Sequence, residues 1–273
     1  MPDLWHFNSI LLNWGARGTS WAGIDDIVFN WFGLQNANFV TSKINFRNMP
    51  KINLLTYDNP KNDWGGLLDR FYKQRTITMS GAIIGTDSYD IETKIDNLKK
   101  ALSVKTGYLE FKIKGVYRRI LCSLSNSDII NRNSYDVDHW KFDLTFTALD
   151  PFWSEKTWTA KTFTGVNAEI NEDINNEGSE YSNPIINILV NSASSTNQIK
   201  VKIWNNEIVI DNTITTWDVV EVNTASKIVT INANSVDFSW KFPYLEAWLN
   251  RLTVKSNGTY DYDVAILFSK NYL

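Results

Sequence analysis

The sequence predicts a mainly β protein of two domains with one α-helix. Its 273 residues exceed what one ordinary core organises, since about 150 residues per domain is the usual expectation. Most apolar residues alternate with period two, which is typical of half-buried strands, while one stretch has the period of an amphipathic helix. Hydrophobic residues make up 43% and charged residues 21% of the chain, which is the composition of an ordinary folded protein.

The helix is predicted over residues 87–102. Four apolar residues recur there at helical spacing: Ile91, Ile95, Leu98 and Leu102. Asp87 or Ser88 can cap its start, and Gly107 follows a few residues after its end. We therefore expect one apolar face of this helix to pack on a sheet.

Strands are predicted on both sides of this helix. Before it, Ile77, Met79 and Ile83 alternate with polar residues, and Gly81 falls in the same series. A glycine there indicates a bulge or a place where a large side chain does not fit. After the helix, two further series alternate: Leu109, Phe111 and Ile113, then Trp140, Phe142, Leu144 and Phe146.

After Pro151 the pattern predicts an all-β second domain. Short strands recur at the spacing of a sandwich, with no second helix of comparable quality, so we place the boundary around residues 151–154. The polar, acidic tract 168–182 is interpreted as a loop inside this domain. Two hairpins are predicted, one turning at Asn205-Asn206 and the other at Asn257-Gly258.

The sequence contains no catalytic or metal-binding signature. Its only histidines are His6 and His139, and Cys122 is its only cysteine, so multi-histidine or multi-cysteine metal sites and a glycine-flanked serine triad are not expected. Five acids could in principle gather around calcium but do not match a calcium loop, and we interpret them as solvated: Glu169, Glu172, Asp173, Glu177 and Glu180. We predict no catalytic residue, no metal and no cofactor.

The distribution of charge also excludes classes of partner. The 27 basic and 30 acidic residues are scattered along the chain and give a net charge of -3. The sequence therefore shows no cluster of basic residues of the kind that binds DNA or RNA. The first 23 residues lack the basic start and apolar run of a secretory signal, and no segment approaches the ~20 apolar residues of a membrane helix. We expect no sequence-specific nucleic acid partner and no membrane insertion.

Several short motifs follow one another in a recognisable order. Trp64-Gly65-Gly66 precedes an Arg-initiated strand, Arg75-Thr76-Ile77-Thr78-Met79-Ser80-Gly81; then come the helix, Gly107-Tyr108-Leu109 and a strand ending in Asp150-Pro151-Phe152-Trp153. In the second half, Asn183-Pro184-Ile185 resembles the start of the strand that enters the carboxy-terminal domain, and Phe242-Pro243-Tyr244-Leu245 precedes Asn250. Each motif alone is weak, but in this order they resemble the distal tail proteins (Dit) of long-tailed bacteriophages.

The resemblance implies a different fold for each of the two domains, and ring assembly for the first. Residues 1–153 would form a β-sandwich or split barrel with one α-helix and an extended hairpin, or belt, and would assemble into a ring. Residues 154–273 would form a galectin-like or carbohydrate-binding-module-like β-sandwich. The chain departs from the family in two places: residues 1–23 look like an additional arm, and Ala247-Trp248-Leu249 stands where the family often has glycine before Asn250.

The function implied by the resemblance is structural, and no enzyme activity is expected. A distal tail protein assembles with copies of itself into a ring, hexameric in the family, which joins the tail tube protein to the tail-tip or baseplate hub protein. The protein would be made in the cytoplasm of a bacterial host and would end in the virion, at the distal end of the tail. The alternative is a carbohydrate-binding adhesion module, whose partner would be a host-surface glycan; a receptor-binding protein is a further candidate partner.

Aromatic residues supply the candidate contact sites. Trp5, Trp14, Trp21, Trp64 and Arg75 are the predicted subunit or partner interface, with packing inside their own domain as the other interpretation of the tryptophans. Trp204, Trp217 and Trp248 are the candidate glycan platform, and for these three a place in the core or in a protein interface is the other interpretation.

Overall fold

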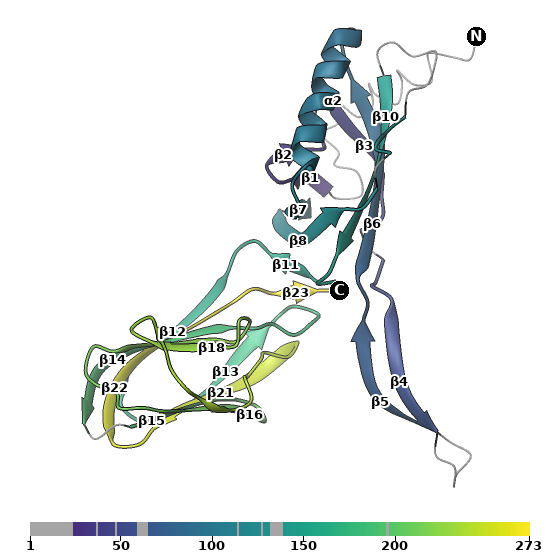
Figure 1. The fold of residues 1–273 in the computed structure, drawn as a ribbon. Coiled ribbons are helices and arrows are strands. Elements are labelled where there is room, and N and C mark those ends of the chain that lie inside the picture. The colour runs from purple at the N-terminus through teal and green to yellow at the C-terminus, as the bar shows by residue number, and fades with distance from the viewer. Residues whose placement is uncertain are drawn as a thin grey trace. The chain divides into compact units, whose positions relative to one another are not determined.

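The structure is a computed structural model of the chain (Figure 1). It describes residues 24–36, 38–46, 48–58, 65–113, 115–126, 128–131, 139–194 and 197–273. The chain divides into two compact units, Met1–Trp153 and Ser154–Leu273. The described residues are mainly in strands, with a single helix, which confirms the predicted fold class at that level.

The first unit is built around one curled antiparallel sheet. Its strands are β1 (Ile24–Phe29), β2 (Phe32–Gly33), β3 (Phe39–Ile44), β6 (Arg75–Ile84), β7 (Gly107–Ile113), β8 (Val116–Leu124), β9 (Ile130–Asn131) and β10 (His139–Ala148), while β11 (Trp153–Glu155) starts at the end of the unit. The main path of the sheet runs β2-β1-β7-β8-β10-β6-β3, and β9 pairs with β10. Phe29 on β1 and Phe146 on β10 meet across the core with ring centroids 4.9 Å apart, so the sheet curls around its own apolar face.

Strands β6 and β10 form the centre of this core. Leu144 pairs with Met79 and Phe146 with Ile77, and all four side chains are buried, as the alternating pattern predicts. Gly81 pairs with Phe142 in the same ladder, and a Cβ at Gly81 would stand 2.4 Å from the Phe142 ring. The glycine is therefore required by the close approach of the phenylalanine.

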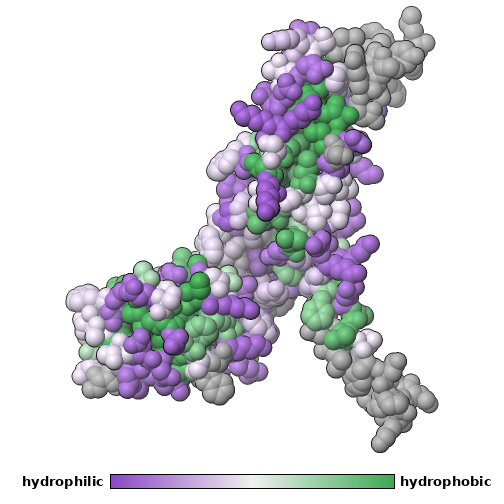
Figure 2. Space-filling view, viewed as in Figure 1, coloured by the Kyte–Doolittle hydropathy of each residue, from purple (hydrophilic) through white to green (hydrophobic). Residues whose placement is uncertain are grey.

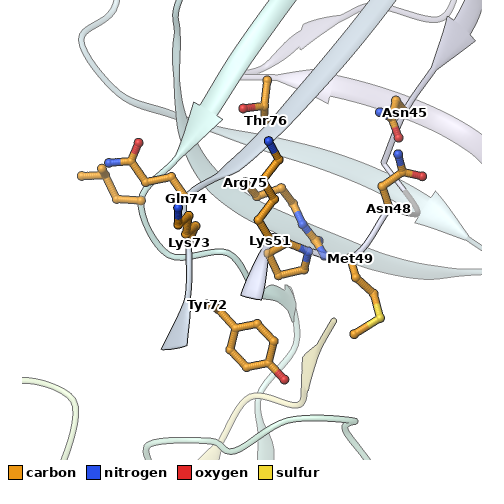
Figure 3. Close-up of a pocket in the computed structure, with 11 residues that line it drawn as sticks. Asn45, Asn48, Met49, Lys51, Tyr72, Lys73, Gln74, Arg75 and Thr76 are labelled. Carbon is orange, nitrogen blue, oxygen red and sulfur yellow. The ribbon is translucent and has the colours of Figure 1, made fainter. Parts of the chain in front are cut away.

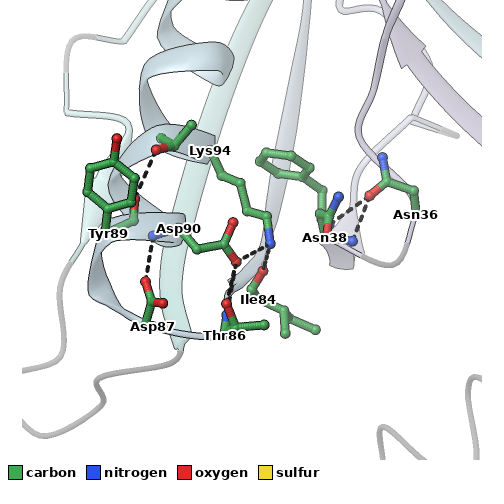
Figure 4. Close-up of polar contacts among 10 residues, drawn as sticks. Asn36, Asn38, Ile84, Thr86, Asp87, Tyr89, Asp90 and Lys94 are labelled. Carbon is green, nitrogen blue, oxygen red and sulfur yellow. Dashed lines mark hydrogen bonds and ion pairs between the residues drawn. The ribbon is translucent and has the colours of Figure 1, made fainter.

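Helix α2 (Ser88–Leu102) follows β6 and buries the four residues that its spacing selects, Ile91, Ile95, Leu98 and Leu102. Asp87 is its N-cap and accepts a hydrogen bond of 2.8 Å from the amide of Asp90. The carboxylate of Asp90 in turn accepts from the amide of Thr86 at 2.9 Å and from Lys94 at 2.7 Å (Figure 4). The predicted helix and its cap are confirmed, and Ser103 ends it.

A separate two-stranded hairpin interrupts the first unit between β3 and β6. It consists of β4 (Ile52–Asp58) and β5 (Gly65–Tyr72), which pair only with each other in the described residues. The amide of Lys73 donates to the carbonyl of Lys51 at 2.7 Å and closes the base of the hairpin. This is the extended hairpin that the resemblance implies.

The second unit contains two antiparallel sheets that share one core. The first sheet, in the order β12-β22-β14-β17-β18-β19, comprises β12 (Thr159–Val166), β22 (Thr259–Phe268), β14 (Ile185–Ser194), β17 (Val219–Asn223), β18 (Ile228–Ile231) and β19 (Asn234–Ser235). The second, in the order β13-β21-β15-β16-β20, comprises β13 (Ile170–Asn176), β21 (Trp248–Ser256), β15 (Gln198–Ile203), β16 (Asn206–Asp211) and β20 (Ser239–Trp240); the unit ends with β23 (Asn271–Tyr272). Inward-facing Ile, Val and Leu side chains of both sheets make a single cluster.

Three local predictions for this unit are wrong. The tract 168–182 contains β13, which pairs residue by residue with β21, because Ile170 and Ile174 face the core while the acids between them face outward. The turn after β15 is Trp204-Asn205, one residue earlier than predicted. Asn257-Gly258 does turn the chain, but it leads from β21 in one sheet to β22 in the other, so the two strands are not a hairpin.

Candidate interaction surfaces

The hairpin β4–β5 exposes apolar side chains on both of its faces. Leu54 and Leu55 are adjacent in β4, so their side chains lie on opposite faces, and they are 59% and 50% exposed. Phe71 on β5 is 52% exposed. Figure 2 shows this apolar surface on the described base of the hairpin. An isolated two-stranded ribbon is marginally stable in water, so this surface is suited to being covered by another protein.

A pocket of about 750 Å³ opens at the base of the same hairpin. Figure 3 shows that most of its lining comes from two segments, one running through the end of β5 into β6 and the other leading into β4. Leu149, after β10, adds a third. Its lining residues are Asn45, Asn48, Met49, Pro50, Lys51, Tyr72, Lys73, Gln74, Arg75, Thr76 and Leu149. They include three cations and no acid, so the pocket is suited to an anionic group.

Arg75, a predicted interface residue, lies in the wall of this pocket and is 3% exposed. None of its three guanidinium nitrogens has a hydrogen-bond partner among the described residues. Its charge lies 5.8 Å from the ring centroid of Trp153, which is a cation–π contact. Burial lowers the pKa of Arg75 to about 10, so the group stays protonated at neutral pH.

The other four predicted interface residues, Trp5, Trp14, Trp21 and Trp64, lie outside the described residues. The sequence interpretation missed a tryptophan that is described, Trp31, which is 89% exposed at the β1–β2 turn. Asn30 and Trp31 both have positive φ, 45° and 75°, as in a type I′ turn. The signal that could have found this turn is Asn30 itself, a residue that tolerates such a backbone.

Of the three candidate platform residues, Trp204 alone lines a described pocket. This groove, of about 380 Å³, lies on the outer face of the second sheet and is lined by Asp173, Lys202, Trp204, Leu249, Arg251 and Thr253. Trp204 is 48% exposed, and Arg251 and Asp173 form an ion pair at 3.7 Å beside it. An aromatic face beside charged hydrogen-bonding groups is the chemistry with which proteins bind sugars and other polar rings.

Trp217 and Trp248 are exposed in other places, at 71% and 75%. Trp217 is the third residue of a turn closed by a hydrogen bond of 3.1 Å from the amide of Asp218 to the carbonyl of Thr215. Its own amide donates to the carbonyl of Val190 on β14, in the first sheet. Trp248 begins β21 and has φ 79°, in the left-handed region. The structure does not bring these two tryptophans into the groove of Trp204.

Metal-binding and reactive groups are a third class of candidate site in the described residues. No group of three or more His, Cys, Asp or Glu side chains is placed there to hold a metal ion. Burial raises the pKa of the Cys122 thiol to about 12, so this thiol is inert near neutral pH. No helix in the described part of the chain is long and apolar enough to cross a membrane.

Comparison with known proteins relates this architecture to a phage tail component. No protein-family model and no curated protein sequence matches the chain. Among solved structures, the Dit protein (gp 19.1) of phage SPP1 superposes with a TM-score of 0.68 over 91% of this chain and 99% of its own, at 13% identity. This chain has a Dit-like fold. The SPP1 protein is described as a paradigm of the hub adsorption apparatus in phages that infect Gram-positive bacteria.

Two weaker likenesses are to the baseplate of phage p2. They have TM-scores of 0.46 and 0.45 at 12% and 11% identity, for the activated conformation with strontium and with calcium. They cover 86% and 89% of this chain, and 92% and 90% of the p2 chains. At these scores we draw nothing from them. The Dit-like fold suggested by the order of the sequence motifs is confirmed by the SPP1 superposition alone.

Proposed function

We propose that this protein is a distal tail protein, a structural component of a phage virion that forms a ring and joins the tail tube to the tail tip or baseplate. The Dit-like fold supports the class of protein. The observation that carries the ring is the hairpin β4–β5, which has no strand partner in the described residues and is apolar on both faces. In a closed ring, each hairpin would lie on the next copy, and that contact would bury Leu54, Leu55 and Phe71.

The finer features of the proposal follow from this assembly. The ring would contain six copies, and its partners would be the tail tube protein and the tail-tip or baseplate hub protein. Residues 1–23, with Trp5, Trp14 and Trp21, would add an arm to the contacts between copies, and Trp64 would add an aromatic contact at the hairpin. The protein would be made in the bacterial cytoplasm, and it would perform no chemistry in the virion.

The experiment is a mass measurement of purified protein, alone and mixed with the neighbouring tail proteins. Wild-type protein should form closed rings, seen also by electron microscopy. Leu54→Lys should weaken association at least tenfold, because it places a charge in the contact. Tyr89→Lys is the matched control, since Tyr89 is 83% exposed but lies on helix α2. A wild-type protein that stays monomeric with every partner would contradict the proposal.

A second candidate function is glycan binding by the Trp204 groove. The combination of a half-exposed indole with Lys202, Asp173 and Arg251 favours it. A glycan array probed with the whole protein should give signals that Trp204→Ala removes. Trp158→Ala should keep them, since Trp158 is equally exposed, at 47%, but does not line the groove. An array without signals, or signals that Trp204→Ala leaves unchanged, would refute this function.

A further inference from the structure

The pocket at the base of hairpin β4–β5 contains a charge without a counter-charge. Arg75 is almost fully buried and has no hydrogen-bond partner among the described residues. Lys51 and Lys73 add two more cations to the lining, and the remaining polar side chains there are neutral. A buried guanidinium with unsatisfied donors destabilises a fold, and a cation–π contact with Trp153 compensates it only in part.

A guanidinium presents its donors in a planar fork. This geometry matches the two oxygens of a carboxylate, which can accept two parallel hydrogen bonds from it. The neutral side chains of Asn45, Asn48 and Gln74 in the same pocket can donate further hydrogen bonds to the segment that carries the acid. The missing partner of Arg75 is therefore best supplied from outside the chain.

We propose that the Arg75 pocket receives an acidic side chain, Asp or Glu, from a second copy of this chain. The inference rests on the proposed ring. It adds a specific ion pair to the apolar contact between neighbouring copies. The carboxylate forms a bidentate pair with Arg75, and Lys51 and Lys73 surround it at the mouth of the pocket. Both lysines are exposed, so they can move aside at little cost as the acid enters.

Three observations favour a second copy as the source of the acid. The pocket is continuous with the apolar hairpin, since Tyr72 belongs to both, so a chain that covers the hairpin also reaches the pocket. With about 750 Å³, the pocket has room for a side chain and the backbone around it. The chain carries 30 acidic residues and a net charge of -3, so a second copy supplies the complementary charge.

The first test uses Arg75→Met in the full-length protein. If the guanidinium awaits an external acid, its replacement leaves the monomer as stable as wild type or more stable, because an uncompensated buried charge is removed. The same substitution should weaken association at least tenfold, because the ion pair is lost. Lys141→Met, an exposed cation on β10, is the control and should change neither quantity. Arg75→Lys should restore association in part, since it returns the charge without the fork.

The opposite pattern would overturn the inference. If Arg75 served only its own domain, through Trp153, Arg75→Met would lower the melting temperature of the monomer and leave the association of the folded fraction unchanged. A direct test joins carboxylates to lysines with a zero-length carbodiimide in mixed ¹⁴N- and ¹⁵N-labelled protein. Mass spectrometry should find Lys51 or Lys73 linked to an acid of the other isotope, and links within one copy alone would count against the proposal.

Adding a free carboxylate distinguishes failure of the proposed ion pair from failure of the proposed ring. Succinate should raise the melting temperature of wild-type monomer and not that of Arg75→Met, and it should compete with association. Rings that form equally well with Arg75→Met would refute the ion pair and leave the ring standing. Wild-type protein that never associates would refute both the ring and the second copy, and a succinate effect would then assign the pocket to a free carboxylate.

Discussion

The ring of Phe142 occupies the space in which a side chain at Gly81 would stand. The two residues pair across β6 and β10, and a Cβ at position 81 would also meet the carbonyl oxygen of Val40 at 2.4 Å. Strands β3 and β10, which flank β6, both lie close to Gly81. The core of the first unit therefore tolerates no added volume at this point.

Gly81→Ala should therefore destabilise the first unit by about 1–3 kcal/mol, since neither Phe142 nor the backbone of β3 can move without repacking the core. Denaturant unfolding, followed for both units, should show the loss in one transition. Thr78→Ala, an exposed change on the same strand, should cost less than about 1 kcal/mol. A Gly81→Ala protein that unfolds like wild type would show that the strands can separate there.

Trp217→Gly should stabilise the second unit by up to about 1 kcal/mol. Trp217 has φ 73° at the third position of its turn, a conformation that glycine adopts freely and a bulky residue does not. The relief of strain exceeds the entropy that glycine adds to the unfolded chain. Trp158→Gly is the matched control, because Trp158 is not among the positive-φ residues, and it should destabilise. Thermal unfolding compares the two variants, and a loss of stability in Trp217→Gly would contradict the prediction.

Asp90→Asn should make the first unit less stable near neutral pH but not in acid. Hydrogen bonds from Lys94 and from the amide of Thr86 hold the pKa of Asp90 below its usual value of 3.8. A depressed pKa means that the stabilisation is complete above the usual value and is lost as the pH falls through the folded value. The difference in unfolding free energy between wild type and variant should shrink over that range. In a Lys94→Met background the difference near neutral pH should be smaller, and an unchanged difference would contradict the assigned cause.

Asn250→Ala should be among the most damaging single changes in the second unit. The Asn250 side chain is fully buried, accepts from the amide of Glu246 at 2.8 Å, and donates to the carbonyls of Glu246 and Trp248 at 2.9 Å each. Its loss removes the hydrogen bonds to the Glu246 amide and the Trp248 carbonyl, at about 1–3 kcal/mol for each group left unpaired. The Glu246 carbonyl keeps a hydrogen bond of 3.2 Å from the side chain of Asn176. Asn175→Ala, an exposed change on β13, should be nearly neutral. Chemical denaturation checks both variants, and equal midpoints would refute the role of the amide.

Patterns of short range predicted the elements of the first unit well. The period of residues 87–102 identified the buried face of α2, and the alternation around Gly81 identified the core face of β6. These features depend on neighbours within a few residues, where helix and strand periods act directly.

Features that depend on distant partners could not be predicted. Asn257-Gly258 is a good two-residue turn locally, but whether the next strand joins the same sheet depends on β14, more than sixty residues earlier. β13 is polar on its outer face, so its sequence alone resembles a loop. It forms a strand because it pairs with β21, which lies far away in the sequence. The burial of Arg75 likewise arises from residues of several elements around the end of β6, which no local pattern brings together.

The position of β22 sets the order in which the second unit can fold. β22 lies between β12 and β14 and pairs with both, although it begins 65 residues after β14 ends. A nascent chain that has emerged from the ribosome only as far as Ser256 therefore has two facing strand edges with nothing between them. The first unit, complete by Trp153, can fold while the ribosome is still elongating, whereas the second must wait and depends in the meantime on not being captured by a neighbouring nascent chain.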